Sequence, residues 1–290
     1  MMRHITRIKA KISIYARKKT SNIFDGSYKS IYTGNGFEFD NLREYIPGDN
    51  IRDIDWKASS RSGNLLVKRY IAEKKHNVML VFDTGKGMCA DTKALQTKKE
   101  VVLNIGGTLG YLASKNGDQV GALYNRNGFI QYYPLKSGLD HLERILTGYE
   151  KEHFEDYQGD LEKSLDYLIK HIRRKMIICV ISDAMGIKNI GDDTLKKLAC
   201  QHDVLFVSIS DADITSGQSY QIDKSMYIPE FISNNKRLQK LEQETKQRIY
   251  DENAKKLLKH RIVLTQIDNE EEIPNKVIEL LERYKYANNC

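Results

Sequence analysis

Residues 77–87 of the chain read Asn-Val-Met-Leu-Val-Phe-Asp-Thr-Gly-Lys-Gly. The apolar run Val78–Phe82 ends directly in an acid, Asp83. Uninterrupted apolar runs of this length are typical of strands that are buried on both faces of a parallel sheet. The same pattern recurs further along the chain, at Met176–Ile181, Val204–Ile209 and Ile262–Ile267. We therefore expect residues 77–286 to form a single α/β domain.

Segments of helical length separate these runs. They are Thr97–Lys115, Ser137–Thr147, Leu161–Arg173, Asp192–His202, Lys236–His260 and Ile273–Lys285. Such alternation predicts a doubly wound, mostly parallel sheet of about six strands. Two further strand-like runs, Gln119–Tyr124 and Phe129–Pro134, are separated by a short connection that contains Asn127-Gly128. A connection of this kind predicts a hairpin, so one edge strand should be antiparallel.

Composition limits the class of protein. The chain has 290 residues, of which 40% are apolar and 29% charged, which excludes a wholly disordered or fibrous chain. The longest apolar run, Met176–Ile181, is far too short for a membrane span, and no secretory leader pattern follows the basic start. The four cysteines contain no Cys-x-x-Cys pair, so we expect neither a disulfide framework nor a zinc site. These features predict a cytoplasmic protein without a transmembrane segment.

The positive charge is concentrated at the N-terminus. Of the 46 basic side chains, seven lie in residues 1–20, which contain no acid, so the remaining 39 match the 39 acids. The body of the chain therefore has no net field to attract nucleic acid. Ile5, Ile8 and Ile12 share one face of a predicted helix in this segment. A basic amphipathic helix can contact an anionic membrane or RNA, but we favour docking of its Ile face on its own domain.

Residues 21–76 form a second region, in which charged and aromatic residues are interleaved. Pro47-Gly48 fits the central positions of a type II turn. The charges predict a partly buried ion-pair network with a structural role, and Trp56 is expected to fill the core of this small, strand-containing domain.

Acids follow four of the predicted strands. Asp83, Asp183, Asp211 and Asp268 should all emerge at the carboxyl edge of the sheet, where such folds bind ligands. Carboxylates at this edge can hold a cation such as Mg²⁺, but acids at strand ends also cap the helices that follow. Both interpretations remain open at this point.

A longer stretch resembles a known family. Four segments are similar to the signature of the domain of unknown function 58 family: Gly36–Phe39, Leu42–Asp49, Arg52–Lys57 and Ser60-Arg61. The short bacterial members of this family lack membrane helices. The signature positions are Glu38, Arg43, Glu44, Tyr45, Pro47, Gly48, Asp49, Arg52, Asp55, Trp56 and Arg61. The resemblance implies that a von Willebrand factor A-like (vWA) domain follows. It also implies a partnership with a MoxR-type AAA+ ATPase, without established enzymatic activity.

The resemblance also implies a metal-ion-dependent adhesion site (MIDAS). This site consists of Asp-x-Ser-x-Ser after the first strand, a Thr in a later loop and an Asp after the fourth strand. The first element here is Asp83-Thr84-Gly85-Lys86-Gly87, and Gly159 stands at the Thr position. Only Asp83 and Asp183 match, so three oxygen ligands are missing, while Lys86 brings a cation into the same loop. We expect loop amides or Lys86 to occupy the two carboxylates. No cofactor is expected, and weakly held Mg²⁺ or Mn²⁺ is the alternative.

These observations favour a non-catalytic interaction protein that partners a MoxR-type ATPase and an unknown protein client, with no specific nucleic acid. Two alternatives remain. One is a metal-dependent hydrolase that combines Asp49, Asp53 and Asp55 with the acids at the sheet edge. The other is a peripheral membrane or RNA binder that acts through residues 1–20.

Overall fold

The computed structural model describes residues 2–18, 35–73, 76–154, 159–213, 215, 220–221, 226–227 and 235–288. The chain divides into two compact units. The large unit comprises Met1–Ile31 and His76–Cys290, and the small unit comprises Tyr32–Lys75. Each unit is described by itself below.

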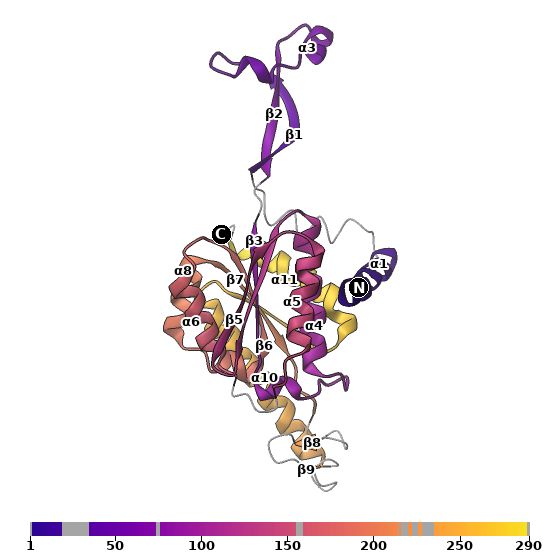
Figure 1. The fold of residues 1–290 in the computed structure, drawn as a ribbon, viewed down its shortest axis with the longest axis vertical. Coiled ribbons are helices and arrows are strands. Elements are labelled where there is room, and N and C mark those ends of the chain that lie inside the picture. Colours follow the sequence, from indigo (N-terminus) through magenta and orange to yellow (C-terminus); the bar gives the residue numbers. More distant parts are fainter. Residues whose placement is uncertain are drawn as a thin grey trace. The chain divides into compact units, whose positions relative to one another are not determined.

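A six-stranded sheet forms the centre of the large unit (Figure 1). Its strands are β3 (Asn77–Phe82), β4 (Gln119–Arg126), β5 (Phe129–Lys136), β6 (Ile177–Asp183), β7 (Asp203–Ile209) and β10 (Val263–Ile267). They lie in the order β10-β7-β6-β3-β4-β5, and every pair is parallel except β4 and β5. The predicted doubly wound sheet with one antiparallel edge hairpin is confirmed.

Helices cover both faces of this sheet. They are α4 (Lys98–Lys115), α5 (Leu139–Glu150), α6 (Leu161–His171), α7 (Ala184–Lys188), α8 (Asp192–Gln201), α10 (Lys236–Leu258) and α11 (Ile273–Asn288). On one face, α6, α8 and α10 bury apolar residues such as Leu165, Leu198 and Leu257 against strand residues including Val180 and Phe206. On the other face, α4, α5 and α11 contact β3, β4 and β10. Burial of this apolar surface is the main force that holds the three layers together.

The N-terminal helix α1 (Arg3–Lys18) packs on the large unit through the apolar face predicted from the sequence. Ile5 and Ile8 are almost completely buried against α4 and α5. The Glu143 carboxylate of α5 accepts hydrogen bonds from the backbone N–H groups of His4 and Ile5 at 2.9 and 2.8 Å. Docking, the interpretation favoured above, is thus confirmed.

The β4–β5 hairpin turns at Asn127 and Gly128, which have φ angles of +47° and +88°. Two successive residues with positive φ make the type of turn whose twist matches that of the flanking strands, and Asn-Gly tolerates it best. The hairpin predicted from the sequence therefore has the geometry that its turn residues favour.

The remaining described elements are short. In the large unit they are the 3-10 turns η2 (Lys86–Cys89) and η4 (Glu270–Glu272) and the strand pair β8 (Tyr220–Gln221) and β9 (Met226–Tyr227). Among the helices of the described residues, none combines the length and the apolar character that crossing a membrane requires.

The small unit is an antiparallel hairpin of β1 (Asn35–Glu44) and β2 (Leu66–Glu73), with η1 (Ile51–Asp53) and α3 (Trp56–Ser62) at one end (Figure 1). Asp49 N–H donates to the Ile46 carbonyl at 3.0 Å and Gly48 has a φ of +108°, as the predicted type II turn requires. Trp56 does not fill a core, contrary to the prediction. Its side chain is 63% exposed, while Ile54 and Val67 are the buried apolar residues of the described part of this unit.

Candidate functional site

The site lies at the carboxyl edge of the large sheet, where chain direction across the sheet reverses. Numbered along the large unit, the strands have the order 3-2-1-4-5-6, so the switch point lies between β3 and β6. Asp83 directly follows β3, and Asp183 is the last residue of β6. Asp211 and Asp268 follow β7 and β10, so all four predicted acids emerge at this edge.

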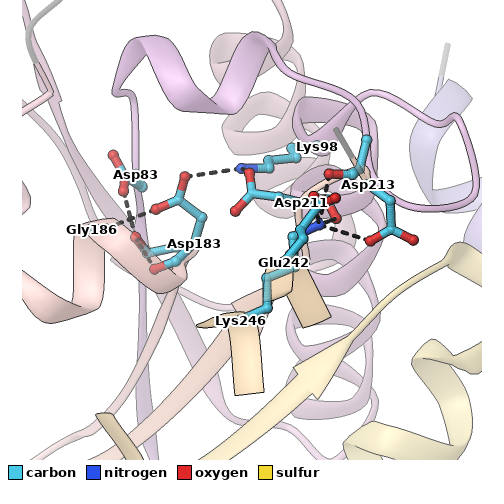
Figure 2. Close-up of polar contacts among 10 residues, drawn as sticks. Asp83, Lys98, Asp183, Gly186, Asp211, Asp213, Glu242 and Lys246 are labelled. Atoms are coloured by element: carbon cyan, nitrogen blue, oxygen red, sulfur yellow. Dashed lines mark hydrogen bonds and ion pairs between the residues drawn. The ribbon is translucent and has the colours of Figure 1, made fainter. Parts of the chain in front are cut away.

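Each oxygen of the two central carboxylates accepts a donor from the protein (Figure 2). Asp83 Oδ1 accepts the Gly85 amide at 2.8 Å, and its Oδ2 accepts the Ser182 hydroxyl at 2.5 Å. Asp183 Oδ1 accepts the Gly186 amide at 2.8 Å, which caps α7. Asp83 and Asp183 thus accept the hydrogen bonds from loop amides that we expected. Asp183 also caps the helix that follows its strand, as strand-end acids often do.

The fourth carboxylate oxygen, Asp183 Oδ2, contacts Lys98, a residue that we did not predict from the sequence. Its Nζ lies 3.0 Å from Asp183 Oδ2 and also forms an ion pair with Asp211 (Figure 2). Lys98 is fully buried in the first turn of α4. A signal for it exists in the sequence, because Lys98 lies three and four residues before the buried Val101 and Val102 and so continues the apolar stripe of the helix. A lysine at a helix N-terminus also opposes the helix dipole unless an acid compensates it.

Electrostatics at the site follow from burial and from these contacts. Burial and the neighbouring charge of Asp183 raise the pKa of the Asp83 carboxyl. Burial works against the charge of Lys98, but attraction from Asp183 and Asp211 prevails and raises the pKa of Lys98 above its ordinary value. The ammonium therefore keeps its positive charge at neutral pH.

A second lysine holds the loop that carries Asp211. Lys246 of α10 donates to the carbonyl oxygen of Ala212 and to the Asp213 carboxylate, both at 2.8 Å, and pairs with Glu242 at 2.9 Å (Figure 2). Glu242 in turn accepts the Thr215 hydroxyl at 2.7 Å. Lys98 thus holds the loop after β7 through the Asp211 carboxylate. Lys246 holds the same loop through the Ala212 carbonyl and the Asp213 carboxylate. A pocket of about 230 Å³ lies beside it, with Asp211, Asp213 and Asp268 in its lining.

The three glycines at MIDAS positions are explained by close packing. A Cβ at Gly87 would lie 2.8 Å from Asp183 Oδ2, and one at Gly85 would lie 3.2 Å from Asp83 Oδ1. A Cβ at Gly159 would meet the backbone of Gly85 at 2.2 Å, so no Thr side chain fits there. Of the other loop positions, the Thr84 hydroxyl bonds to the Asn125 carbonyl, and Lys86 begins η2.

This donor set does not fit a divalent metal. All four carboxylate oxygens at Asp83 and Asp183 accept protein donors, the hydroxyl ligands are replaced by glycines, and a buried ammonium lies against Asp183. Mg²⁺ needs about six oxygens in near-octahedral order. Among the described residues, no group of three or more His, Cys, Asp or Glu side chains has a geometry that would hold an ion.

The signature residues lie in the small unit and are only partly paired. Arg43 contacts Asp49 at 2.5 Å, and the Arg43 side chain lowers the pKa of that carboxyl. Asp55 caps α3 by accepting the Lys57 and Ala58 amides, and the bond from Ala58 lowers its pKa. The predicted network is incomplete, since Arg52 and Arg61 form no ion pair within the described residues. Tyr45 N–H donates to the Leu65 carbonyl, and the Asn64 amide donates to Glu44; Glu38 lies in β1, with its side chain outside the described part.

Comparison with known proteins now identifies the family. The family model "Protein of unknown function DUF58" matches residues 41–215, which is more than half of the chain. The chain belongs to the DUF58 family. Uncharacterized proteins of Mycobacterium tuberculosis and Mycobacterium bovis are 25% identical to this DUF58 chain over 202 residues, which cover 69% of it. The match spans 63% of the length of those relatives.

Solved structures with a similar arrangement include two of interest. The conserved hypothetical protein BatB from Bacteroides thetaiotaomicron has 14% identity and a TM-score of 0.48, with 72% of this chain and 98% of that chain covered. A von Willebrand factor type A structure from Catenulispora acidiphila has 8% identity and a TM-score of 0.41, with 76% and 44% covered.

Proposed function

We propose that this DUF58 chain is a non-catalytic protein-interaction module that partners a MoxR-type AAA+ ATPase. One observation carries the proposal: the buried Lys98 ammonium bridges Asp183 and Asp211 at the switch point of the sheet. Open α/β sheets bind their ligands at this place. Here the protein's own cation balances the acids, so the edge keeps its shape without a metal.

The proposal separates protein binding from metal binding. In this mechanism Lys98 and Lys246 hold the loop after β7 in one conformation, and the edge is presented to a partner as a preformed surface. A preformed surface binds without a further ordering cost. The ATPase as partner is supported by the family resemblance, and an ATP-dependent partner would place the chain in the cytoplasm.

Binding to the ATPase is the first test. The purified full chain should bind the MoxR-type ATPase of its own organism in a light-scattering or interferometry assay. Its affinity should be the same whether the chain was dialysed against EDTA or against Mg²⁺ before mixing. Absence of binding, or binding only by the metal-loaded chain, would contradict the proposal.

Metal binding and turnover form the second test. Calorimetry with Mg²⁺ and with Mn²⁺ should show no binding, and the chain alone should hydrolyse neither nucleotides nor phosphoesters. Micromolar metal binding that disappears in Asp183→Ala would show a working metal site. Hydrolysis that disappears in Asp83→Ala would establish the hydrolase alternative instead.

A further inference from the structure

The end of the small unit that carries α3 exposes four large apolar side chains. Trp56, Ile46 and Ile51 are 63%, 60% and 64% exposed, and Leu65 is 47% exposed. Scattered apolar residues on a surface need no explanation, but a group of them in so short a segment marks an interaction site.

Backbone hydrogen bonds gather these residues at one end of the hairpin. Tyr45 N–H donates to the Leu65 carbonyl at 2.8 Å, so Ile46 and Leu65 lie at the same end of the β1–β2 ladder. Asp55 N–H donates to the Leu66 carbonyl at 2.9 Å, which places Trp56 next to that point. Ile51 lies one 3-10 turn before Ile54, whose backbone pairs with Val67. We call this group, Ile46, Ile51, Trp56 and Leu65, the apolar tip.

Three basic side chains accompany the apolar tip. Arg52, Lys57 and Arg61 are exposed, and within the described part of the chain none of them contacts a carboxylate. Two of the nearby acids are already engaged, because Asp49 pairs with Arg43 and Asp55 caps α3 and contacts Lys68. An exposed Trp beside Arg side chains that contact no carboxylate among the described residues has the composition of a binding hot spot.

We propose that the apolar tip inserts into an apolar pocket on the ATPase partner, and that carboxylates at the rim of this pocket pair with Arg52, Lys57 and Arg61. This inference rests on the proposed function, and it adds a contact made by the small unit to the one proposed for the sheet edge of the large unit. A protein is favoured over an anionic membrane because four acids and four bases lie between residues 42 and 66, and such a neutral segment lacks the basic excess that membrane anchoring requires.

The experiment compares affinities of full-length variants for the ATPase. Trp56→Ser should weaken binding by about 30-fold, as loss of a central Trp does at interfaces. Arg61→Glu should weaken binding and reduce its dependence on salt, because a favourable charge pair becomes repulsive. The matched controls are Phe129→Ser, which removes another exposed aromatic, and Lys197→Glu, which reverses an exposed base on α8; both should bind as the parent chain does. Since all four side chains are exposed, thermal melting should stay unchanged.

Each other result has a definite meaning. If the parent chain does not bind the ATPase, the proposed function and this inference both fail. If it binds and Trp56→Ser binds equally well, only the inference fails. Trp56-dependent sedimentation with anionic phosphatidylglycerol vesicles, or a Trp56-dependent dimer in light scattering, with ATPase affinity unchanged, would assign the tip to a membrane or to a second copy and overturn the inference. If Trp56→Ser lowers the melting temperature, Ile51→Ser replaces it as the test variant. Weaker ATPase binding by Ile51→Ser then supports the inference, and unchanged binding overturns it.

Discussion

At the scale of single residues, Lys98 determines the character of the sheet edge. Its ammonium lies against Asp183 and Asp211, and its side chain is 1% exposed. A buried charge is tolerated only when opposite charges and hydrogen bonds compensate its lost hydration. The lysine and the carboxylates therefore depend on each other for stability.

Replacement of Lys98 tests this dependence. Lys98→Met should lower the free energy of unfolding by about 3–5 kcal/mol, because Asp183 is left buried without its counter-charge. The second replacement Asp183→Asn should recover part of this loss, since the uncompensated charge is removed. Urea unfolding provides the measurement, with Lys197→Met, on the exposed face of α8, as the control. Equal losses in Lys98→Met and in the control would contradict the prediction.

Asp83 should make stability depend on pH. Its pKa is raised in the folded chain, so the folded state keeps this proton at pH values at which the unfolded chain has lost it. The stability due to Asp83 therefore grows as pH falls through the folded pKa towards the ordinary value of 3.8, and shrinks as pH rises.

The variant Asp83→Asn, which cannot ionise, should thus gain stability relative to the parent chain as pH rises from mildly acidic to neutral. Urea unfolding at several pH values measures the difference. Loss of the hydrogen bond from Gly85 or Ser182 would change the unfolding free energy of the variant by the same amount at every pH. A stability difference that does not depend on pH would therefore count against the raised pKa of Asp83.

At the scale of elements, α1 shows how an amphipathic basic helix is used. Its apolar residues face α4, where Gly107 leaves room for Ile8: a Cβ at Gly107 would lie 2.1 Å from Ile8 Cδ1. The side chains of Arg3, Arg7 and Lys9 are exposed, and Arg7 and Lys11 pair with Glu270. The apolar face that a membrane would need is already in contact with the protein.

Two substitutions test this packing together. Ile8→Ala should cost about 2–5 kcal/mol of unfolding free energy, the usual range for a buried Ile, whereas the half-buried Ile12→Ala should cost less. Gly107→Ala alone should also destabilise, because its new methyl group collides with Ile8. In the double variant the methyl group enters the space that Ile8 vacates, so the sum of the single losses should exceed the measured loss. Strict additivity would show that α1 does not pack here.

At the scale of the whole molecule, the two units differ in how they are stabilised. The large unit has helices packed on both faces of its sheet and buries many apolar side chains between these layers. The small unit has a two-stranded sheet with few buried side chains among its described residues. Two-stranded hairpins are marginally stable by themselves. The small unit therefore depends more than the large unit does on local hydrogen bonds. Examples are the Asp55 cap of α3 and the bond that the Leu66 amide donates to the Ser59 hydroxyl.

Hydrogen exchange should reveal this difference. Amides of β1 and β2 should exchange faster than those of β3 and β6, since local opening costs least where little apolar surface is buried. Asp55→Ala should accelerate exchange in α3 and leave the exchange of β3 unchanged, because the lost cap affects only the small unit. Equal exchange at β1 and β3 in the parent chain, or faster exchange at β3 in the variant, would show instead that the units unfold together.

The sequence by itself determined the architecture of the large unit. Its buried strands read as continuous apolar runs, and Asn127-Gly128 marked the antiparallel edge, because side-chain burial and turn geometry act over a few neighbouring residues. The alignment of Asp83 and Asp183 at one edge followed from the parallel topology alone. The glycines at 85, 87 and 159 were visible in the sequence as missing ligands.

Only the tertiary structure decided what replaces those ligands and where Trp56 lies. Lys98 is fifteen positions from Asp83 and far from Asp183 and Asp211 along the chain, and packing of α4 on the sheet brings its ammonium to them. Trp56 was expected inside because aromatic residues bury large apolar areas, yet no second layer covers it among the described residues of the small unit. Burial depends on how much of the chain gathers around a residue, and that quantity is a property of the fold rather than of the residue type.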